Sequence, residues 1–115
     1  MEEKSIFEKI RDGEIPAQMV YEDEHCMCFH DIQPQAPVHA LLVPKQRINR
    51  IGVAESTDAT VLGHMMTKVA EITKTLGIDE SGFRLVVNNG RDGGETVPHL
   101  HIHILGGRKL EWPPG

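Results

Sequence analysis

The sequence is poor in aromatic residues, and it has no surplus of positive charge. Phe, Tyr and Trp make up only 4% of the 115 residues, and Lys and Arg together number 12 against 17 for Asp and Glu. The formal net charge of −5 leaves no basic surplus for gripping the phosphate backbone of DNA or RNA. We therefore expect no nucleic-acid polymer as a partner, whereas a single mononucleotide is compatible with this charge.

Long apolar runs and cysteines are also scarce. No stretch approaches the roughly 20 apolar residues that a transmembrane helix needs. The N-terminal residues Met1 to Lys4 lack both the basic start and the apolar core of a secretory signal. The only cysteines, Cys26 and Cys28, would stand about 6.6 Å apart in a strand with parallel side chains, which is a poor geometry for a disulfide. We therefore expect a cytoplasmic protein with no membrane partner.

The patterning predicts one domain over residues 1–115, because no repeat, low-complexity tract or linker divides the chain. Ser5 and Glu8 form a capping-box pattern at the start of a short helix that ends near Gly13. A second helix is predicted from about Thr57 to Leu76. There, apolar residues recur at spacings of three and four: Leu62, Met65, Val69, Ile72 and Leu76.

Strand patterns occupy most of the rest of the chain. We expect strands over 25–31, 38–43, 83–89 and 98–105, with a short apolar run at 19–21. Only the glycine-rich loop from Gly90 to Glu95 joins the last two strands, so these strands should pair antiparallel. Long strands without regular strand–helix alternation indicate the α+β class.

Three histidines alternate with apolar residues near the C-terminus, in the order His99-Leu100-His101-Ile102-His103. In a strand, successive side chains point to opposite faces, so the three imidazoles would share one face while the aliphatic residues pack on a helix. Val or Thr would suit a half-buried sheet better, so packing alone does not call for three histidines here.

Three interpretations of this alternation compete. The first is a polar sheet face without function, which would bury imidazoles without partners. The second is a metal site, since imidazole is a common zinc ligand, but no carboxylate stands nearby to orient the ligands. The third is a phosphate-reactive site, since imidazole acts as nucleophile, general acid and neutral donor near pH 7. The loop from Asn89 to Thr96 favours the third, because its glycines let backbone N–H groups turn toward an anion and it ends in a hydroxyl.

The stretch from Thr96 to Gly107 resembles the His-x-His-x-His motif of the histidine triad (HIT) family. Further matches lie at 29–39, 42–45, 62–64, 86–88 and 92–94, and at the C-terminal Trp-Pro-Pro-Gly. The likeness covers nearly the whole chain. It points to the histidine triad nucleotide-binding branch, the purine nucleoside phosphoramidases.

The resemblance implies an α+β fold with a five-stranded antiparallel sheet and two helices. It also implies a homodimer whose two sheets join into one ten-stranded sheet. The implied reaction is hydrolysis of the P–N bond of adenosine or guanosine 5′-phosphoramidates through a nucleotidyl-histidine, with no cofactor and an AMP or GMP moiety as ligand. Two alternatives stay open for the same site. They are hydrolysis of dinucleoside polyphosphates, and a nucleotide-binding regulatory module with weak catalysis.

The resemblance also implies catalytic roles for individual residues. His101 is the nucleophile, and His103 contacts the phosphate oxygens. His99 and His39 form the supporting hydrogen-bond chain that orients the cluster. The Thr96 hydroxyl helps to hold the phosphate and the leaving group. The usual residue at this position is Ser, and Thr keeps the hydroxyl but restricts its rotamer.

The remaining implied roles are in binding. The expected substrate-binding residues comprise a base wall, a ribose acceptor and a phosphate loop: Phe29, His30 and Ile32; Asp31; and Asn88, Gly94, Glu95, Thr96 and Val97, besides His101 and His103. Some bacterial relatives carry a Cys-x-x-Cys near the start that helps to bind zinc. This chain has Ser5-Ile6-Phe7-Glu8 there, so we expect no metal.

Overall fold

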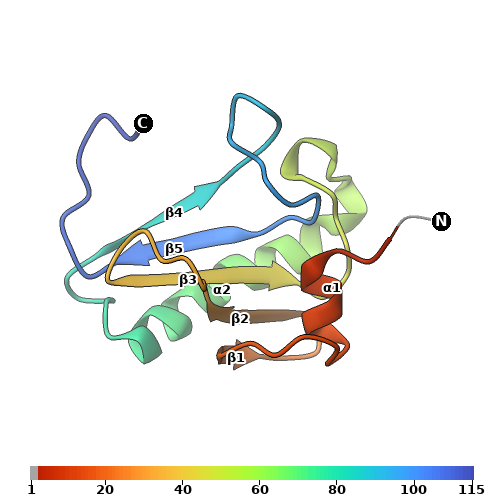
Figure 1. Cartoon of the computed structure of the whole chain (residues 1–115), viewed down its shortest axis with the longest axis horizontal. Helices are drawn as coiled ribbons and strands as arrows, with labels where there is room; N and C mark the ends of the chain where they lie inside the picture. The colour runs from red at the N-terminus through yellow and green to blue at the C-terminus, as the bar shows by residue number, and fades with distance from the viewer. Residues whose placement is uncertain (1–2) are drawn as a thin grey trace.

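The computed structural model describes residues 3–115 and builds them around one antiparallel sheet (Figure 1). The sheet has five strands in the order β1-β2-β3-β5-β4, and two α-helices accompany it. The elements in chain order are α1 (Ile6–Arg11), β1 (Met19–Glu22), β2 (Cys26–His30), β3 (Val38–Pro44), the 3-10 turns η1 (Ile51–Val53) and η2 (Ser56–Asp58), α2 (Ala59–Leu76), β4 (Phe83–Val87) and β5 (Ile102–Gly106). The predicted α+β class, five-stranded antiparallel sheet and two helices are confirmed.

The sheet carries an apolar core on each face. Helix α2 covers one face, where the side chains of Met65 and Ile72 pack with Leu42 and Ile104 of the strands. The opposite face carries a smaller cluster, in which Phe7 of α1 joins side chains of β2 and β3: Met27, Phe29, Leu41 and Val43. Figure 1 shows α2 running behind the sheet and α1 beside one end of β2 and β3. The second face is therefore covered by helix only at one end.

Helix α2 follows the predicted apolar stripe, whose members are buried or pack at the edge of the core. Gly77 ends the helix with a φ of +74°, a conformation that glycine adopts without strain. The expected start at Thr57 lies instead in the 3-10 turn, and the α-helix begins at Ala59. This turn is stabilised by Glu55 and Asp58, whose side chains cap each other's backbone N–H groups.

The last strand is shorter than predicted. The expected strand over 98–105 begins only at Ile102, so His103 is in the strand while His99 and His101 lie on the bent segment before it. The reason is the pairing of the backbone. The His99 N–H donates to the Val97 oxygen at 2.9 Å, and the Leu100 N–H donates to the Ile48 oxygen at 2.6 Å. This segment is therefore held by the loop after β3 rather than by a neighbouring strand.

Both cysteines are buried and unlinked, as the strand geometry predicted. Cys26 and Cys28 pack in the core beneath α2, and burial raises the pKa of each thiol to about 12. Among residues 3–115, no helix is long and apolar enough to cross a membrane.

Candidate active site

Two histidines from neighbouring strands face each other on the less covered side of the sheet. His39 of β3 and His103 of β5 place Nε2 and Nδ1 only 2.9 Å apart. The backbone N–H of Gln35 donates to His39 Nδ1 at 2.9 Å, and a backbone N–H can only donate. Neutral His39 therefore carries its proton on Nε2 and donates it to His103 Nδ1. The proton of neutral His103 is then on Nε2.

Burial keeps these two imidazoles neutral. It lowers the pKa of His39 below its ordinary value of 6.5, against the opposing effect of Asp31. The pKa of His103 falls to about 4, first because of burial and then because of the neighbouring His101 and His39. At neutral pH the pair therefore has one N–H that its two rings do not use, at His103 Nε2.

His101 lies beside His103, with ring centroids 5.1 Å apart. Its Nδ1 lies 2.8 Å from the backbone oxygen of His99, which can only accept, so Nδ1 carries a proton. In the neutral ring the lone pair is then on Nε2. The ring of Phe7 packs edge-on against His101 with centroids 5.0 Å apart. The arrangement can therefore offer a nucleophilic nitrogen beside a hydrogen-bond donor on His103.

His99 is fully buried, and neither nitrogen of its ring bonds to the other two histidines of the motif. Its Nε2 donates to the Pro44 oxygen at 2.9 Å, and its Nδ1 lies 2.7 Å from Ser5 Oγ. Burial is the largest cause that lowers the pKa of this imidazole. The contact that His99 makes to His101 is therefore through its backbone oxygen, on His101 Nδ1, while its ring bonds Ser5 and Pro44.

The glycine-rich loop is closed by a half-buried carboxylate. Glu95 accepts from the Gly90 N–H at 2.9 Å and pairs with two nitrogens of Arg50, at 2.8 and 2.9 Å. The Arg50 contact, followed by the Gly90 N–H, lowers the pKa of Glu95 to about 2. At Gly93 a Cβ would lie 2.8 Å from the backbone nitrogen of Asn89, so only glycine fits. The loop is therefore restricted to one conformation, which the Glu95 side chain stabilises.

The other residues expected at the phosphate differ in their surroundings. Asn88 donates from Nδ2 to the Gly93 oxygen at 2.6 Å, so its amide also braces the loop. Gly94 has a φ of +75°, and Val97 packs against the Phe7 cluster. Thr96 is exposed at the end of the loop, so its hydroxyl is accessible to a ligand.

The expected base and ribose residues are only partly brought together. Phe29 is buried, with its ring 5.8 Å from that of Phe7, and Ile32 is 91% exposed. Asp31 follows β2, with Oδ2 3.4 Å from His39 Nε2. His30 pairs in register with a helix-side residue, Ala40, so it lies on the α2 face and does not join Phe29.

Within the described residues, 3–115, two groups of side chains have the spacing of metal ligands. Asp31, His39 and His103 place one ligand atom each within 4.8 Å of one another, as do Asp23, Cys26 and His64. The first group belongs to the cluster above, where hydrogen bonds join its members. In the second, the Asp23 carboxylate accepts from the Tyr21 hydroxyl at 2.7 Å and bonds His64 Nε2 at 2.6 Å, while its other oxygen accepts two backbone N–H groups. Every acceptor position of that carboxylate is occupied, which indicates a structural junction.

Three neighbours of the cluster carry no sequence signal for this role. Ser5 reads only as a helix cap, Phe7 as an apolar residue of a short helix, and Gln35 contributes only its backbone N–H. The His99 contact of Ser5 spans 94 positions of the chain, so local pattern cannot show it.

Comparison with known proteins identifies the family to which the chain is similar. The model of the HIT domain matches residues 12–110. An uncharacterised HIT-like protein of Synechocystis is 52% identical over 115 residues, 100% of both chains. The crystal structure of a HIT family hydrolase from Legionella pneumophila has a TM-score of 0.93 at 42% identity, covering 97% of this chain and 100% of that one. A histidine triad nucleotide-binding protein from Candida albicans has a TM-score of 0.82 at 31% identity, covering 96% of this chain and 83% of that one.

The sheet and its two helices are those of a HIT-like α+β protein. This chain belongs to the HIT domain family. The resemblance seen in the His-x-His-x-His segment is thereby confirmed at the level of the family.

Proposed function

We propose that this chain is a hydrolase that cleaves the P–N bond of purine nucleoside 5′-phosphoramidates through a nucleotidyl intermediate on His101. The orientation of His101 carries the proposal. Its Nδ1 is tied to the His99 backbone oxygen at 2.8 Å, and Nε2 keeps the lone pair that attacks phosphorus. The names of two structural neighbours, a HIT family hydrolase and a histidine triad nucleotide-binding protein, support a nucleotide substrate.

Two displacements at phosphorus make up the reaction. His101 Nε2 bonds to phosphorus as the P–N bond to the amine breaks, and the amine leaves with that electron pair. Water then attacks the same phosphorus, the bond to Nε2 breaks, and its electron pair returns to the imidazole as the nucleoside monophosphate departs. The Thr96 hydroxyl gives its proton to the leaving amine in the first displacement and takes one back from the attacking water in the second.

Hydrogen-bond donors in fixed positions stabilise the negative charge on the phosphate oxygens. The Nε2–H of His103 points out of the His39–His103 pair, because the other nitrogen of His103 accepts from His39 at 2.9 Å. At the other side of the site, the backbone N–H groups of Thr96 and Val97 add donors, since those of Gly94 and Glu95 already donate to backbone oxygens of the loop. Since the loop is braced by Glu95 and Arg50, these donors need little reorganisation during the reaction.

The nucleoside lies along the end of β2 in this proposal. The Asp31 carboxylate, whose side chain is 18% exposed, accepts from the ribose hydroxyls. The exposed Ile32 and the ring of Phe29 form the apolar wall for the purine. Binding then fills a place where Ile32 otherwise leaves a large apolar side chain in water.

A homodimer completes the proposal. Strand β4 is an edge of the sheet, and its Phe83 and Val87 remain 37% and 41% exposed. An unpaired edge with apolar side chains favours pairing with another strand. Two copies joined edge to edge would form the ten-stranded sheet, and light scattering that gives the mass of one chain would contradict it.

The proposed activity is tested with a panel of two bond types. The parent, His101→Asn and a control, His25→Asn, are each given an adenosine 5′-phosphoramidate and a diadenosine polyphosphate. His25 is half exposed and outside the site. We expect the parent and the control to release the amine, and His101→Asn to lose about 10³-fold or more in turnover while still binding AMP. Cleavage of the polyphosphate alone, or full turnover by His101→Asn, would refute the proposal.

A further inference from the structure

We propose that Ser5 is a positioning residue, through which helix α1 holds His99 and thereby the nucleophilic form of His101. The catalytic consequence of this inference rests on the function proposed above, whereas its structural part does not. The family model matches residues 12–110, so α1 lies outside the matched segment even though it contacts the histidine cluster.

The hydroxyl of Ser5 has one proton to give, and His99 is its acceptor. Ser5 is the N-cap of α1, where Oγ accepts from the Glu8 N–H at 3.0 Å. The Glu8 carboxylate in turn accepts from the Ser5 N–H at 2.9 Å. His99 Nε2 is engaged as a donor by the Pro44 oxygen, so in the neutral ring Nδ1 carries the lone pair. The 2.7 Å contact is therefore an O–H donated by Ser5 to His99 Nδ1.

The peptide unit between His99 and Leu100 is then held from both sides. The ring of His99 is fixed at both nitrogens, one by α1 and one by the end of β3. The Leu100 N–H donates to the Ile48 oxygen at 2.6 Å. Because a peptide is planar and trans, fixing this N–H also fixes the opposite direction of the His99 carbonyl. That carbonyl accepts from His101 Nδ1 at 2.8 Å and so keeps the lone pair on Nε2.

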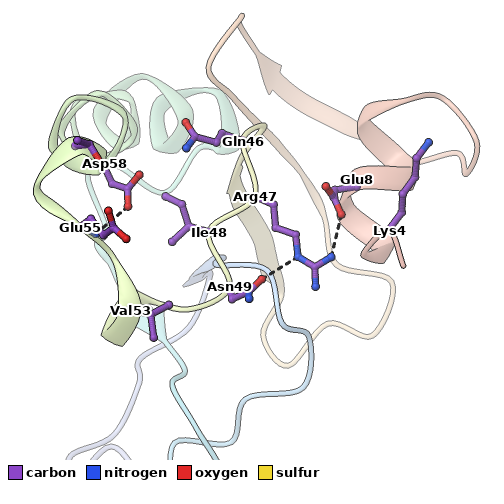
Figure 2. A pocket seen from close by; sticks show the side chains of 10 residues that line it. Lys4, Glu8, Gln46, Arg47, Ile48, Asn49, Val53, Glu55 and Asp58 are labelled. Atoms are coloured by element: carbon purple, nitrogen blue, oxygen red, sulfur yellow. Dashed lines mark hydrogen bonds and ion pairs between the residues drawn. The ribbon is translucent and has the colours of Figure 1, made fainter. Parts of the chain in front are cut away.

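Arg47 ties α1 to the same segment. Its Nη1 donates to the Glu3 oxygen at 2.8 Å and to Glu8 at 3.2 Å, while its Nε donates to the Pro98 oxygen at 3.1 Å and to Asn49 at 2.9 Å. Figure 2 shows the guanidinium of Arg47 between Glu8 of α1 and Asn49, at the wall of a surface cleft. The start of α1 is therefore fixed to the residue that precedes His99, which keeps Ser5 in place.

A second side chain of the same helix contacts the same histidines. The ring of Phe7, only 4% exposed, meets His99 and His101 edge-on with centroids 5.5 and 5.0 Å apart. Helix α1 has only six residues, too few for stability in isolation. Its contacts with the two histidines therefore stabilise the helix as well as the histidines. A change at Ser5 is therefore transmitted to the histidines rather than absorbed by the helix.

Removal of the hydroxyl would leave a buried nitrogen without a donor. His99 would then turn or take up a proton, and its carbonyl would be held toward His101 from one side only, by the Leu100 N–H on the Ile48 oxygen. The proton of His101 would be shared between Nδ1 and Nε2, and the form with a proton on Nε2 cannot attack. Substrate contacts are untouched, so kcat should fall by about tenfold with little change in KM.

Four proteins test this inference: the parent, Ser5→Gly, Ser5→Thr and Lys9→Ala. Glycine is an adequate N-cap and costs a helix little relative to serine, so Ser5→Gly removes the hydroxyl while sparing the cap. Ser5→Thr keeps the hydroxyl, and Lys9→Ala changes an exposed residue of the same helix. Nitrogen-15 spectra of the imidazoles give the tautomer of His101, and steady-state kinetics on a purine nucleoside phosphoramidate give kcat and KM.

We expect His101 to be protonated on Nδ1 in the parent, Ser5→Thr and Lys9→Ala, and to be a mixture of tautomers in Ser5→Gly, with the loss confined to kcat. An unchanged His101 tautomer and an unchanged kcat in Ser5→Gly would overturn the inference. So would a loss in Lys9→Ala equal to that in Ser5→Gly. If the parent does not turn over the phosphoramidate, the proposed function fails, while the change of tautomer in Ser5→Gly still decides whether α1 positions His101.

Discussion

Acidification should destabilise this protein through His103. In the unfolded chain this imidazole takes up a proton near pH 6.5, whereas burial and the neighbouring His101 and His39 lower its pKa to about 4 in the folded protein. Between these values the unfolded state binds more protons. The free energy of unfolding is therefore at its full value above pH 6.5 and falls until the pH reaches about 4. From pH 7 to pH 5 the loss is about 2 kcal/mol, since one pH unit below the unfolded pKa is worth about 1.4 kcal/mol per proton.

Urea unfolding followed by circular dichroism at the two pH values measures this loss. The matched variant is His103→Asn, which lacks the titrating imidazole but keeps every carboxylate whose titration affects both proteins. The variant should start less stable at pH 7 and lose about 2 kcal/mol less than the parent on acidification. Equal losses in the two proteins would show that His103 is not held neutral by its surroundings.

Changes at three other positions test the loop, the core and the leaving-group side. In Gly93→Ala the new Cβ would lie 2.8 Å from the Asn89 backbone nitrogen, so AMP binding by calorimetry should weaken, whereas Gly63→Ala, with open space around it, should bind normally. Phe7→Ala should lower the free energy of unfolding by about 3–5 kcal/mol in urea titrations, and a loss below about 1 kcal/mol would contradict its burial. Thr96→Ala should slow amine release by about tenfold or more, and Thr96→Ser should restore it; equal rates in both would remove the hydroxyl from the reaction.

The elements that depend on local pattern could be predicted from the sequence. The stripe from Leu62 to Leu76 requires a helix with one buried face, and α2 has that face against the sheet. The capping box at Ser5 and Glu8 likewise marks the start of α1, because its contacts span only three residues.

The elements that depend on distant partners could not be predicted. Alternation of His and aliphatic residues suits a strand, yet the backbone of Leu100 pairs with Ile48 in the loop after β3, so β5 begins only at Ile102. The partners of the His99 ring, Ser5 and the Pro44 oxygen, are likewise distant in sequence. The predicted supporting role of His99 did not specify an atom, and in the structure its carbonyl contacts His101 while its ring bonds Ser5 and Pro44.

The binding residues show the same division. Asp31 follows a strand end and lies beside His39, as a short carboxylate at that position should. His30 is its neighbour in sequence but points to the opposite face, because strand residues alternate and the register pairs it with Ala40. A run of motif residues is therefore not a run of site residues when it lies in a strand.

The attachment site of the nucleotidyl group tests the central claim most directly. The parent is mixed with an adenosine 5′-phosphoramidate, quenched under denaturing conditions that preserve P–N bonds, digested, and mapped by mass spectrometry. The orientation of His101, with Nδ1 bound to the His99 oxygen at 2.8 Å, predicts an adenylyl group on His101 and none in His101→Gly. An adenylyl group on His99, His103 or any other residue would contradict the assignment of the nucleophile.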